Sequence, residues 1–243
     1  SLGISTGNLS TASFRLFGRD GSMLPESNGA PYLDDLSEIA VQTVDGGDGI
    51  LNGSDYVLFY APGPDQWITD TISLAFSHQK NRYSNQSFYF INIGGNGKRV
   101  ATAALLGQPA TAVNTFTARY FYDTDSINFL AGGKEWFGEE FANAPGKALS
   151  RNFSLPFSGV IPVTPVTLST SCAARSVGVA GRFDIRIDNQ PLAQLTVNPV
   201  GSAVYDPVAQ MATVTTSAPA ASVSPQISYT FIPGSFNAQG WLN

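Results

Sequence analysis

The chain has 243 residues, of which 43% are hydrophobic and 12% aromatic, so it can bury a sizeable core and is too apolar for wholesale disorder. Charged residues make up only 13%, about half the usual share, and Ser, Thr, Asn and Gln supply most of the polarity. The net charge of −5 gives no electrostatic footprint for nucleic acid or an anionic membrane surface. Because no apolar run reaches about 18 residues, we also expect no direct membrane insertion.

Short runs of alternating apolar and polar residues dominate the chain, and each run is bounded by Gly, Pro, Asn or Asp. Such a pattern is typical of β-strands joined by turns. The runs lie at 13–17, 40–44, 87–93, 116–122, 166–170, 181–189, 192–197, 211–216 and 227–232.

One run is particularly regular. Residues 181–189 place their charged side chains on one face and Phe183, Ile185 and Ile187 on the other, and a turn at 189–191 leads into the next strand. Helical patterns are scarce: residues 31–40 have room for one turn, and 67–79 reads only weakly as amphipathic because of its β-branched residues.

The composition changes along the chain near residues 94–97. Aromatic residues and carboxylates are dense before this point, whereas the part after Lys147 is rich in Ser, Thr, Val, Ala and Pro, with evenly spaced strands. We predict an all-β, mostly antiparallel protein with an N-terminal β-module, residues 1–100, packed on a jelly-roll-like β-sandwich, residues 101–243. The start, "SLGISTG", has neither a methionine nor a signal segment, and we expect an internal piece of a longer protein.

The chain contains one cysteine, Cys172, and one histidine, His78, so no disulfide can form within it. A cysteine nucleophile needs a nearby base, and these two residues are the single available pair. No local nucleophile pattern surrounds either residue. We therefore favour a buried thiol and a hydrogen-bonded histidine over a catalytic dyad.

Three glutamates, Glu135, Glu139 and Glu140, flank a Trp-Phe-Gly sequence. Two of them at a suitable separation, together with Trp136, would suit a glycoside hydrolase cleft. Acidic residues in a solvated loop are far commoner, and we favour that interpretation. The surrounding glycines, Gly132, Gly133 and Gly138, predict instead a turn that is clamped onto the core by burial of Trp136.

Two acidic segments, 45–55 and 123–128, carry oxygen ligands at spacings that could suit calcium. Neither matches the EF-hand loop. Asp and Gly at such positions more often form turns through side-chain-to-backbone hydrogen bonds, so we favour turns. Phosphate loops, zinc spacings and dinucleotide fingerprints are missing from the sequence. We predict no catalytic, cofactor-binding or metal-binding residues and no cofactor.

Several segments in order resemble the N-terminal region of the PorU family, the gingipain-related C-terminal signal peptidases (sortases) of the Bacteroidetes type IX secretion system. They are "FRLFGRDGSMLPESNGAPYLDDLSEIAV", "DYVLFYAPGPDQW", "FSHQKNRYSNQSFYFINIGGNGKRV", "INFLAGGKEWFGEEF" and the closing "GSFNAQGWLN". The resemblance is specific through 136–141 and diffuse between about 150 and 235. Lys134 departs from it, because an Arg is expected there.

The resemblance implies a cell-surface, outer-membrane cysteine peptidase and transpeptidase that trims C-terminal sorting domains from exported cargo. Its catalytic Cys and His would lie in a caspase-like domain after this chain, since His78 is followed by Gln rather than Gly and Cys172 has no matching context. We therefore expect a non-catalytic accessory region: a scaffold, a docking surface or a prodomain-like lid. Its partners would be its own C-terminal peptidase domain and other type IX secretion components or exported cargo.

The resemblance also suggests how two aromatic segments are used. Residues 56–60 would form a central strand buried on both faces, Pro62 and Pro64 would end it at a corner, and Trp67 would return over the edge of the core. At the chain end, a further strand would close the sandwich. Its absence would leave an exposed strand edge and deprive Trp241 and Leu242 of part of their packing.

An alternative from a different class stays open: a carbohydrate-binding β-sandwich module of a secreted protein. Trp67, Trp136 and the nine tyrosines motivate it. An exposed coplanar aromatic platform would favour the sugar-binding module, and buried tryptophans would favour the scaffold.

Overall fold

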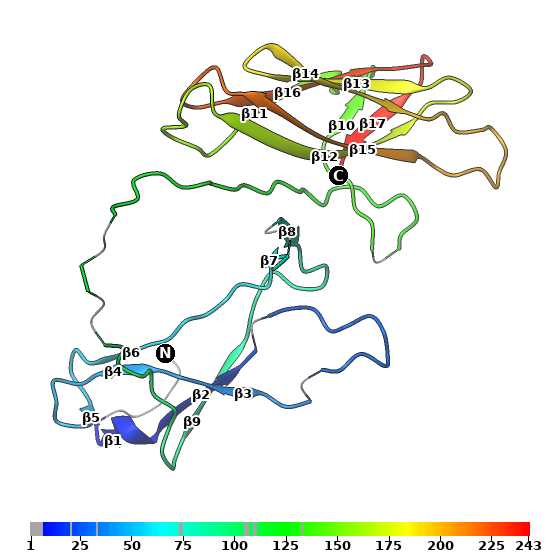
Figure 1. The fold of residues 1–243 in the computed structure, drawn as a ribbon. Coiled ribbons are helices and arrows are strands. Elements are labelled where there is room, and N and C mark those ends of the chain that lie inside the picture. Colours follow the sequence, from blue (N-terminus) through cyan, green and yellow to red (C-terminus); the bar gives the residue numbers. More distant parts are fainter. Residues whose placement is uncertain are drawn as a thin grey trace. The chain divides into compact units, whose positions relative to one another are not determined.

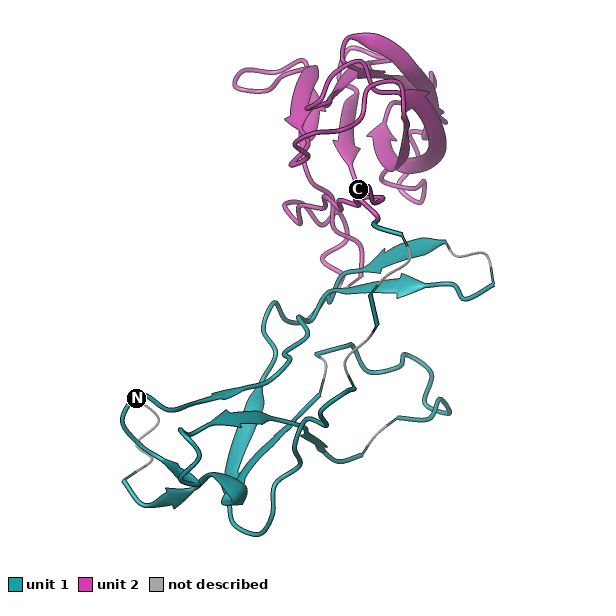
Figure 2. Ribbon diagram, turned by 60° about the vertical axis from the view of Figure 1, so that its left-hand side comes forward, with its two compact units in different colours: residues 1–112 teal, residues 113–243 magenta. Residues whose placement is uncertain are grey.

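A computed structural model describes residues 7–19, 21–32, 34–72, 75–104, 107–108, 111–132 and 134–243. The chain is nearly all β, with 41% of its residues in strands, and the described ranges contain no α-helix. It divides into two compact units, Ser1–Ala112 and Val113–Asn243 (Figures 1 and 2). The described residues hold no helix long and apolar enough to cross a membrane. The all-β prediction is confirmed.

The second unit is built from two four-stranded antiparallel sheets, with strand orders β10-β17-β12-β15 and β11-β16-β13-β14 (Figure 1). The strands are β10 (Glu140–Ala142), β11 (Ser150–Ser154), β12 (Pro165–Arg175), β13 (Gly181–Ile187), β14 (Gln190–Val197), β15 (Gln210–Pro219), β16 (Gln226–Ile232) and β17 (Gln239–Leu242). Pairing is nested: the first strand pairs with the last, the second with the seventh, the third with the sixth and the fourth with the fifth. This nesting of eight strands in two sheets is a jelly roll, as predicted.

Three phenylalanine rings fill the space between these sheets. Phe141 from one sheet meets Phe183 from the other edge to face at 5.5 Å, and Phe183 lies 4.8 Å from Phe231. All three are fully buried. The rings fit because Gly240 faces them: a Cβ there would lie 2.6 Å from Phe183 Cζ.

Strand β13 shows how the alternating pattern becomes a sandwich face. Phe183, Ile185 and Ile187 are buried, and the charged residues between them face outward, as predicted. The turn into β14 lies at Asp188 and Asn189, whose φ angles are +47° and +67°, rather than at 189–191. Both values suit a two-residue hairpin turn, in which Asp and Asn tolerate positive φ.

The Asp188 carboxylate also fixes a second loop. It accepts hydrogen bonds from the main-chain amides of Ala221 (3.1 Å), Ser222 (3.1 Å) and Gln226 (2.9 Å). These three bonds hold the β15–β16 connection against the β13–β14 hairpin, so one side chain organises this end of the sandwich.

The end of the chain is packed differently from the prediction. Strand β17 lies inside its sheet, paired with β10 on one side and β12 on the other. Trp241 and Leu242, expected to lack part of their packing, are only 4% and 8% exposed. Strand β10, which lies outside the predicted alternating runs, pairs with one side of β17.

A bridged segment before β10 covers the outer side of Trp241. Ile127 and Phe137 pair through main-chain hydrogen bonds, and Phe129 lies 4.6 Å from the Trp241 ring and stacks on Phe137 at 4.4 Å. Phe137 is 3% exposed, whereas Trp136 is 39% exposed. The predicted aromatic clamp therefore exists, but Phe137 rather than Trp136 is its buried residue, because the bridge directs alternate side chains to opposite faces.

The predicted strand at 116–122 is wrong. This segment pairs with no other described segment, and Phe116 is 89% exposed. Two of its rings, Tyr120 and Tyr122, make edge contacts with Phe157 and Phe153. The prediction rested on alternation alone, and no strand of the described residues pairs with this segment.

The first unit is a set of short antiparallel strands around a smaller core. β2 (Phe14–Gly18) follows a 3₁₀ turn at Thr11–Ser13 and lies between β3 (Ser37–Ile39) and β9 (Tyr89–Ile93). Three two-stranded ribbons complete the unit: β1 (Leu9–Ser10) with β5 (Ile50–Leu51), β4 (Gln42–Val44) with β6 (Tyr56–Leu58), and β7 (Gln66–Thr69) with β8 (Phe76–Gln79). The core contains Leu9, Phe14, Leu16 and Val41. The helical readings of 31–40 and 67–79 are replaced by β3 and by the β7–β8 ribbon, although residues 33, 73 and 74 lie outside the described ranges.

The prediction of a central strand at 56–60 is also wrong. β6 ends at Leu58, pairs with β4 alone among the described strands, and leaves Tyr56 and Leu58 each 50% exposed. Val57 alone packs against the core. Aromatic side chains on both faces therefore do not mean burial on both faces, because no second layer of described residues covers this ribbon.

The expected corner is present after β6. The Pro62 carbonyl accepts hydrogen bonds from the Tyr89 hydroxyl (3.1 Å) and the Ser87 hydroxyl (3.3 Å), which hold the exit of the strand in place. Trp67 does not return over the core. It is 45% exposed and contacts His78 edge to face at 4.9 Å across the β7–β8 ribbon.

Replacing Gly240 with Ala tests the fit between the sheets. Because the facing rings are fully buried and cannot swing into solvent, Gly240→Ala is expected to destabilise the second unit by about 1–3 kcal/mol. Urea unfolding measures the loss. Gly132→Ala is the matched control, since no atom lies within 4 Å of a Cβ there and its φ is not positive; a loss for Gly240→Ala no larger than the control's would contradict the packing argument.

The neighbouring aromatics give a second test. Phe137→Ala is expected to cost about 3–5 kcal/mol as a buried large-to-small change, whereas Trp136→Ala should cost only about 1 kcal/mol. Both variants are compared by urea melts of the whole chain. An equal loss of unfolding free energy in the two variants, or a larger loss for Trp136→Ala, would contradict the burial of Phe137 and the exposure of Trp136.

Candidate functional site

Cys172 lies in the middle of the sandwich core on β12, between Ala212 on β15 and Leu242 on β17. It is fully buried, and this burial raises the pKa of its thiol to about 12. A nucleophilic cysteine needs a thiolate and access to substrate, and Cys172 has neither near neutral pH. The prediction of a buried structural thiol is confirmed. His78 belongs to β8 of the other unit, where it packs against Trp67.

The three glutamates considered for sugar chemistry have separate environments. Glu135 is exposed, Glu139 accepts a hydrogen bond from the Tyr122 hydroxyl, and Glu140 binds the Lys147 ammonium at 2.6 Å and the Gln239 amide at 2.8 Å. The Lys147 contact lowers the pKa of Glu140, which keeps it ionised. Glu140 is thus an ion-pair partner within the sandwich and not the raised-pKa acid that glycoside hydrolysis requires.

The acidic loop at 45–55 is a set of turns. Asp45 accepts from the Thr11 hydroxyl (2.7 Å) and the Gly47 amide (3.1 Å), Asp48 from the Ile50 amide (2.9 Å), and Asp55 from the Asn52 amide (2.8 Å). These bonds confirm the prediction of side-chain-to-backbone turns. The segment 123–128 leads into the Ile127–Phe137 bridge. In the described ranges, no three His, Cys, Asp or Glu side chains gather closely enough to hold a metal ion.

Most ring contacts among the described residues are edge to face, and a sugar platform would need exposed coplanar rings. Exposed rings such as Trp67 and Phe59 make edge contacts with their neighbours, His78 and Tyr89. The stacked pair that the structure describes, Phe129 and Phe137, includes a buried ring and packs against Trp241. Trp67 and Trp136 are nevertheless 45% and 39% exposed, so the carbohydrate-binding alternative stays open.

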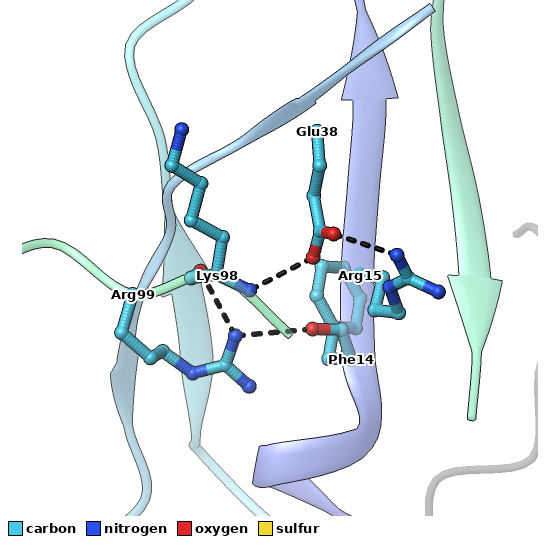
Figure 3. Close-up of polar contacts among 5 residues, drawn as sticks. All are labelled: Phe14, Arg15, Glu38, Lys98 and Arg99. Carbon is cyan, nitrogen blue, oxygen red and sulfur yellow. Dashed lines mark hydrogen bonds and ion pairs between the residues drawn. The ribbon is translucent and has the colours of Figure 1, made fainter. Parts of the chain in front are cut away.

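A polar cluster fixes the first unit around β2 (Figure 3). The Arg15 guanidinium donates to one Glu38 oxygen at 2.7 Å, and the Lys98 main-chain amide donates to the other at 2.8 Å. Figure 3 shows the Lys98 ammonium pointing away from Glu38, so only the Lys98 backbone takes part. The Arg15 contact, followed by the Lys98 bond, lowers the pKa of Glu38 to about 2.

Arg99 completes this cluster by capping carbonyl groups. It donates to the Phe14 oxygen at 3.2 Å and the Lys98 oxygen at 3.0 Å (Figure 3), and it also donates to the Thr11 oxygen. Segment 98–100 is thereby held beside Val41 without belonging to a sheet strand. The sequence did not reveal this cluster, because its members are far apart in the chain; its donors and acceptors serve folding.

One surface feature was also missed. Loops at one end of the sandwich surround an open hollow of about 420 Å³ lined by Arg175, Val177, Ser235, Phe236 and Asn237. This feature is called the Arg175 hollow below. No motif marks it, since it combines Arg175 at the end of β12 and Val177 just after it with a loop about sixty residues later.

Comparisons with known proteins support the fold alone. No protein-family model matches the sequence, and no curated protein matches it. Among solved structures, the chain is similar to a dimeric latent PorU from Porphyromonas gingivalis, with a TM-score of 0.61 and 18% sequence identity. The similarity covers 95% of this chain but only 21% of the PorU chain. The chain therefore has a PorU-like fold and spans about one fifth of the length of that protein.

The Glu38 cluster predicts a pH dependence for the first unit. Because the folded-state pKa is lowered to about 2 from 4.5, the stabilisation is fully present above about pH 5 and is lost as the pH falls toward 2. Glu38→Gln should lower the melting temperature of this unit at neutral pH and weaken its acid dependence. The loss of the folded NMR signals of the first unit, followed on heating at neutral pH and on acidification, measures both effects. Glu26→Gln, which removes an exposed ion pair with Arg82, is the control; an identical acid profile in wild type and Glu38→Gln would refute the assignment.

Proposed function

We propose that this chain is a non-catalytic accessory region of a PorU-type sortase, acting as a scaffold, docking surface or prodomain-like lid. The observation that carries the proposal is the match of nearly the whole chain, both units included, to one fifth of latent PorU. In this proposal the parent is a cell-surface, outer-membrane peptidase that removes C-terminal sorting domains from exported cargo. The catalytic Cys and His belong to another domain of the parent.

The chemistry of the described residues supports an accessory role. The one thiol is buried in the sandwich core and protonated near neutral pH. The carboxylates of the acidic loop at 45–55 accept main-chain hydrogen bonds within turns. A rigid sandwich that presents loops at its ends is a common support for binding surfaces. The partners in this proposal are the parent's own peptidase domain, other type IX secretion components of the outer membrane, and exported cargo.

The non-catalytic role is tested on the isolated chain. It should cleave no member of a peptide library, and a thiol-directed active-site probe should label Cys172 only after denaturation, because the buried thiol is neither ionised nor accessible. Peptide turnover that disappears in Cys172→Ala would overturn the proposal.

The accessory role is tested in cells that carry the full-length gene. Removing residues 113–243 in frame should reduce the trimming of sorting domains from exported cargo, while the purified peptidase domain still cleaves a short peptide. The control is a parent with the same tag and no deletion, matched for surface level. Undiminished cargo trimming after the deletion would remove the basis for a docking or scaffold role.

A further inference from the structure

The Arg175 hollow is formed by loops that belong to different strand connections. Arg175 ends β12, Val177 lies in the β12–β13 loop at 176–180, and Ser235, Phe236 and Asn237 lie in the β16–β17 loop at 233–238. The β14–β15 loop at 198–209 is bound to the first of these, since the Gly178 amide donates to the Val200 oxygen at 3.1 Å. The nested topology thus brings three distant parts of the sequence to one end of the sandwich.

These loops are fixed by close main-chain contacts. The Val200 amide donates to the Ser176 oxygen at 2.9 Å, and the Ala238 amide donates to the Ser235 oxygen at 3.1 Å. A Cβ added at Gly234 would lie 2.3 Å from the Ala180 oxygen, so the β16–β17 loop is packed directly on the β12–β13 loop. The hollow is therefore preformed, which lowers the entropic cost of binding a partner.

Arg175 brings an uncompensated positive charge to the hollow. Among the described residues its guanidinium has no hydrogen-bond or ion-pair partner, and the side chain is exposed. The three loops contain one acidic residue, Asp206. Its carboxylate accepts the Ala203 amide at 2.6 Å and lies over Gly201, so it is committed within its own loop.

The surroundings of this charge are apolar. Phe236 is 82% exposed and Val177 43% exposed, and both line the hollow. Farther along the same loops, Val179, Val204 and Tyr205 also present exposed apolar side chains. An arginine that is flanked by exposed apolar and aromatic side chains combines the two features that are enriched at protein interaction sites.

We propose that the Arg175 hollow binds an extended peptide segment in which an Asp or Glu side chain is flanked by apolar residues. The carboxylate would receive hydrogen bonds from the Arg175 guanidinium, whose planar fork matches a carboxylate, with the Asn237 amide and the Ser235 hydroxyl as further donors. The apolar neighbours would lie against Phe236 and Val177. This inference rests on the proposed docking function and names the chemistry of the partner.

Charge balance selects this partner over a phosphate. Arg175 is the one cationic side chain in the hollow and its three loops, and a single positive charge matches a carboxylate better than a phosphate dianion. The hollow is open to solvent. An extended peptide can therefore cross it, with the acidic residue in the hollow and the flanking residues on either side.

The test is an NMR titration of the isotope-labelled full chain with a short peptide blocked at both ends, with glutamate between leucine and phenylalanine. The expected result is a shift of the Val177, Ser235 and Asn237 amides. Arg175→Gln should weaken binding by at least about tenfold, the usual effect of losing a charged hydrogen-bond partner. Arg186→Gln, at the β13–β14 end of the same sandwich, should leave the affinity unchanged.

Three further ligands distinguish the possible recognition modes. Equal binding of the same peptide with glutamine in place of glutamate, or no binding of either, overturns the proposal. Equal or tighter binding of an unblocked peptide ending in leucine would show capture of a chain end instead, and displacement by inorganic phosphate at similar concentrations would show a general anion site. A melting curve of Arg175→Gln that matches wild type shows that its weaker binding is not a folding defect. A failure of the peptide to bind would overturn the peptide-binding proposal and not the accessory role. The accessory role is tested separately, by cargo trimming after removal of residues 113–243.

Discussion

The close fit of Phe141, Phe183 and Phe231 between the two sheets is the constraint on which the second unit depends. One ring comes from the sheet of β10 and two from the sheet of β13, so none is buried until strands far apart in the sequence are in place. Gly181 and Gly240 leave space for the rings, since a Cβ at either position would lie within 3 Å of a phenyl carbon. Such interlocking favours one register for each strand, and it places the loop ends reproducibly.

The two units reach order by different means. The sandwich has a core cluster of thirteen buried residues, whereas the first unit has four in its cluster, within the parts that the structure describes. Polar contacts hold the strands of the first unit together. Arg99 donates to three carbonyl groups, and Glu38 links β3 to β2 and to the segment at Lys98. Many of its aromatic side chains are exposed, among them Tyr60 and Phe90. Exposed apolar surface on this scale is typical of regions that contact other protein.

The position of Cys172 makes this thiol a packing residue and not a nucleophile near neutral pH. Burial of Cys172 between the sheets serves packing, and the pKa of the thiol is raised accordingly. In our proposal the binding surface of the sandwich lies at its loop end, where Arg175 and Phe236 are exposed. Rigid strands with recognition residues on their connections are a general solution for binding proteins.

The sequence alone was sufficient for the fold class and for many of the strands. Alternation located β2, β4, β9, β12, β13, β14, β15 and β16, because more buried and less buried residues alternate along most of these strands, and the spacing after Lys147 predicted the jelly roll. The turn chemistry of Asp45, Asp48 and Asp55 was also readable, since those bonds are local.

Burial and pairing across the chain were decided by the tertiary structure. The alternating segment at 116–122 pairs with no described strand, the aromatic run at 56–60 is half exposed, and Phe137 rather than Trp136 is the buried ring. The short strands β10 and β17 have little pattern of their own; β17 is held by pairing with both β10 and β12, and β10 by pairing with β17. The Arg15–Glu38–Arg99 cluster and the Arg175 hollow were equally invisible, because each joins residues from distant segments. A one-dimensional pattern records which side chains alternate, whereas burial depends on whether another layer lies opposite, and only the folded chain supplies that layer.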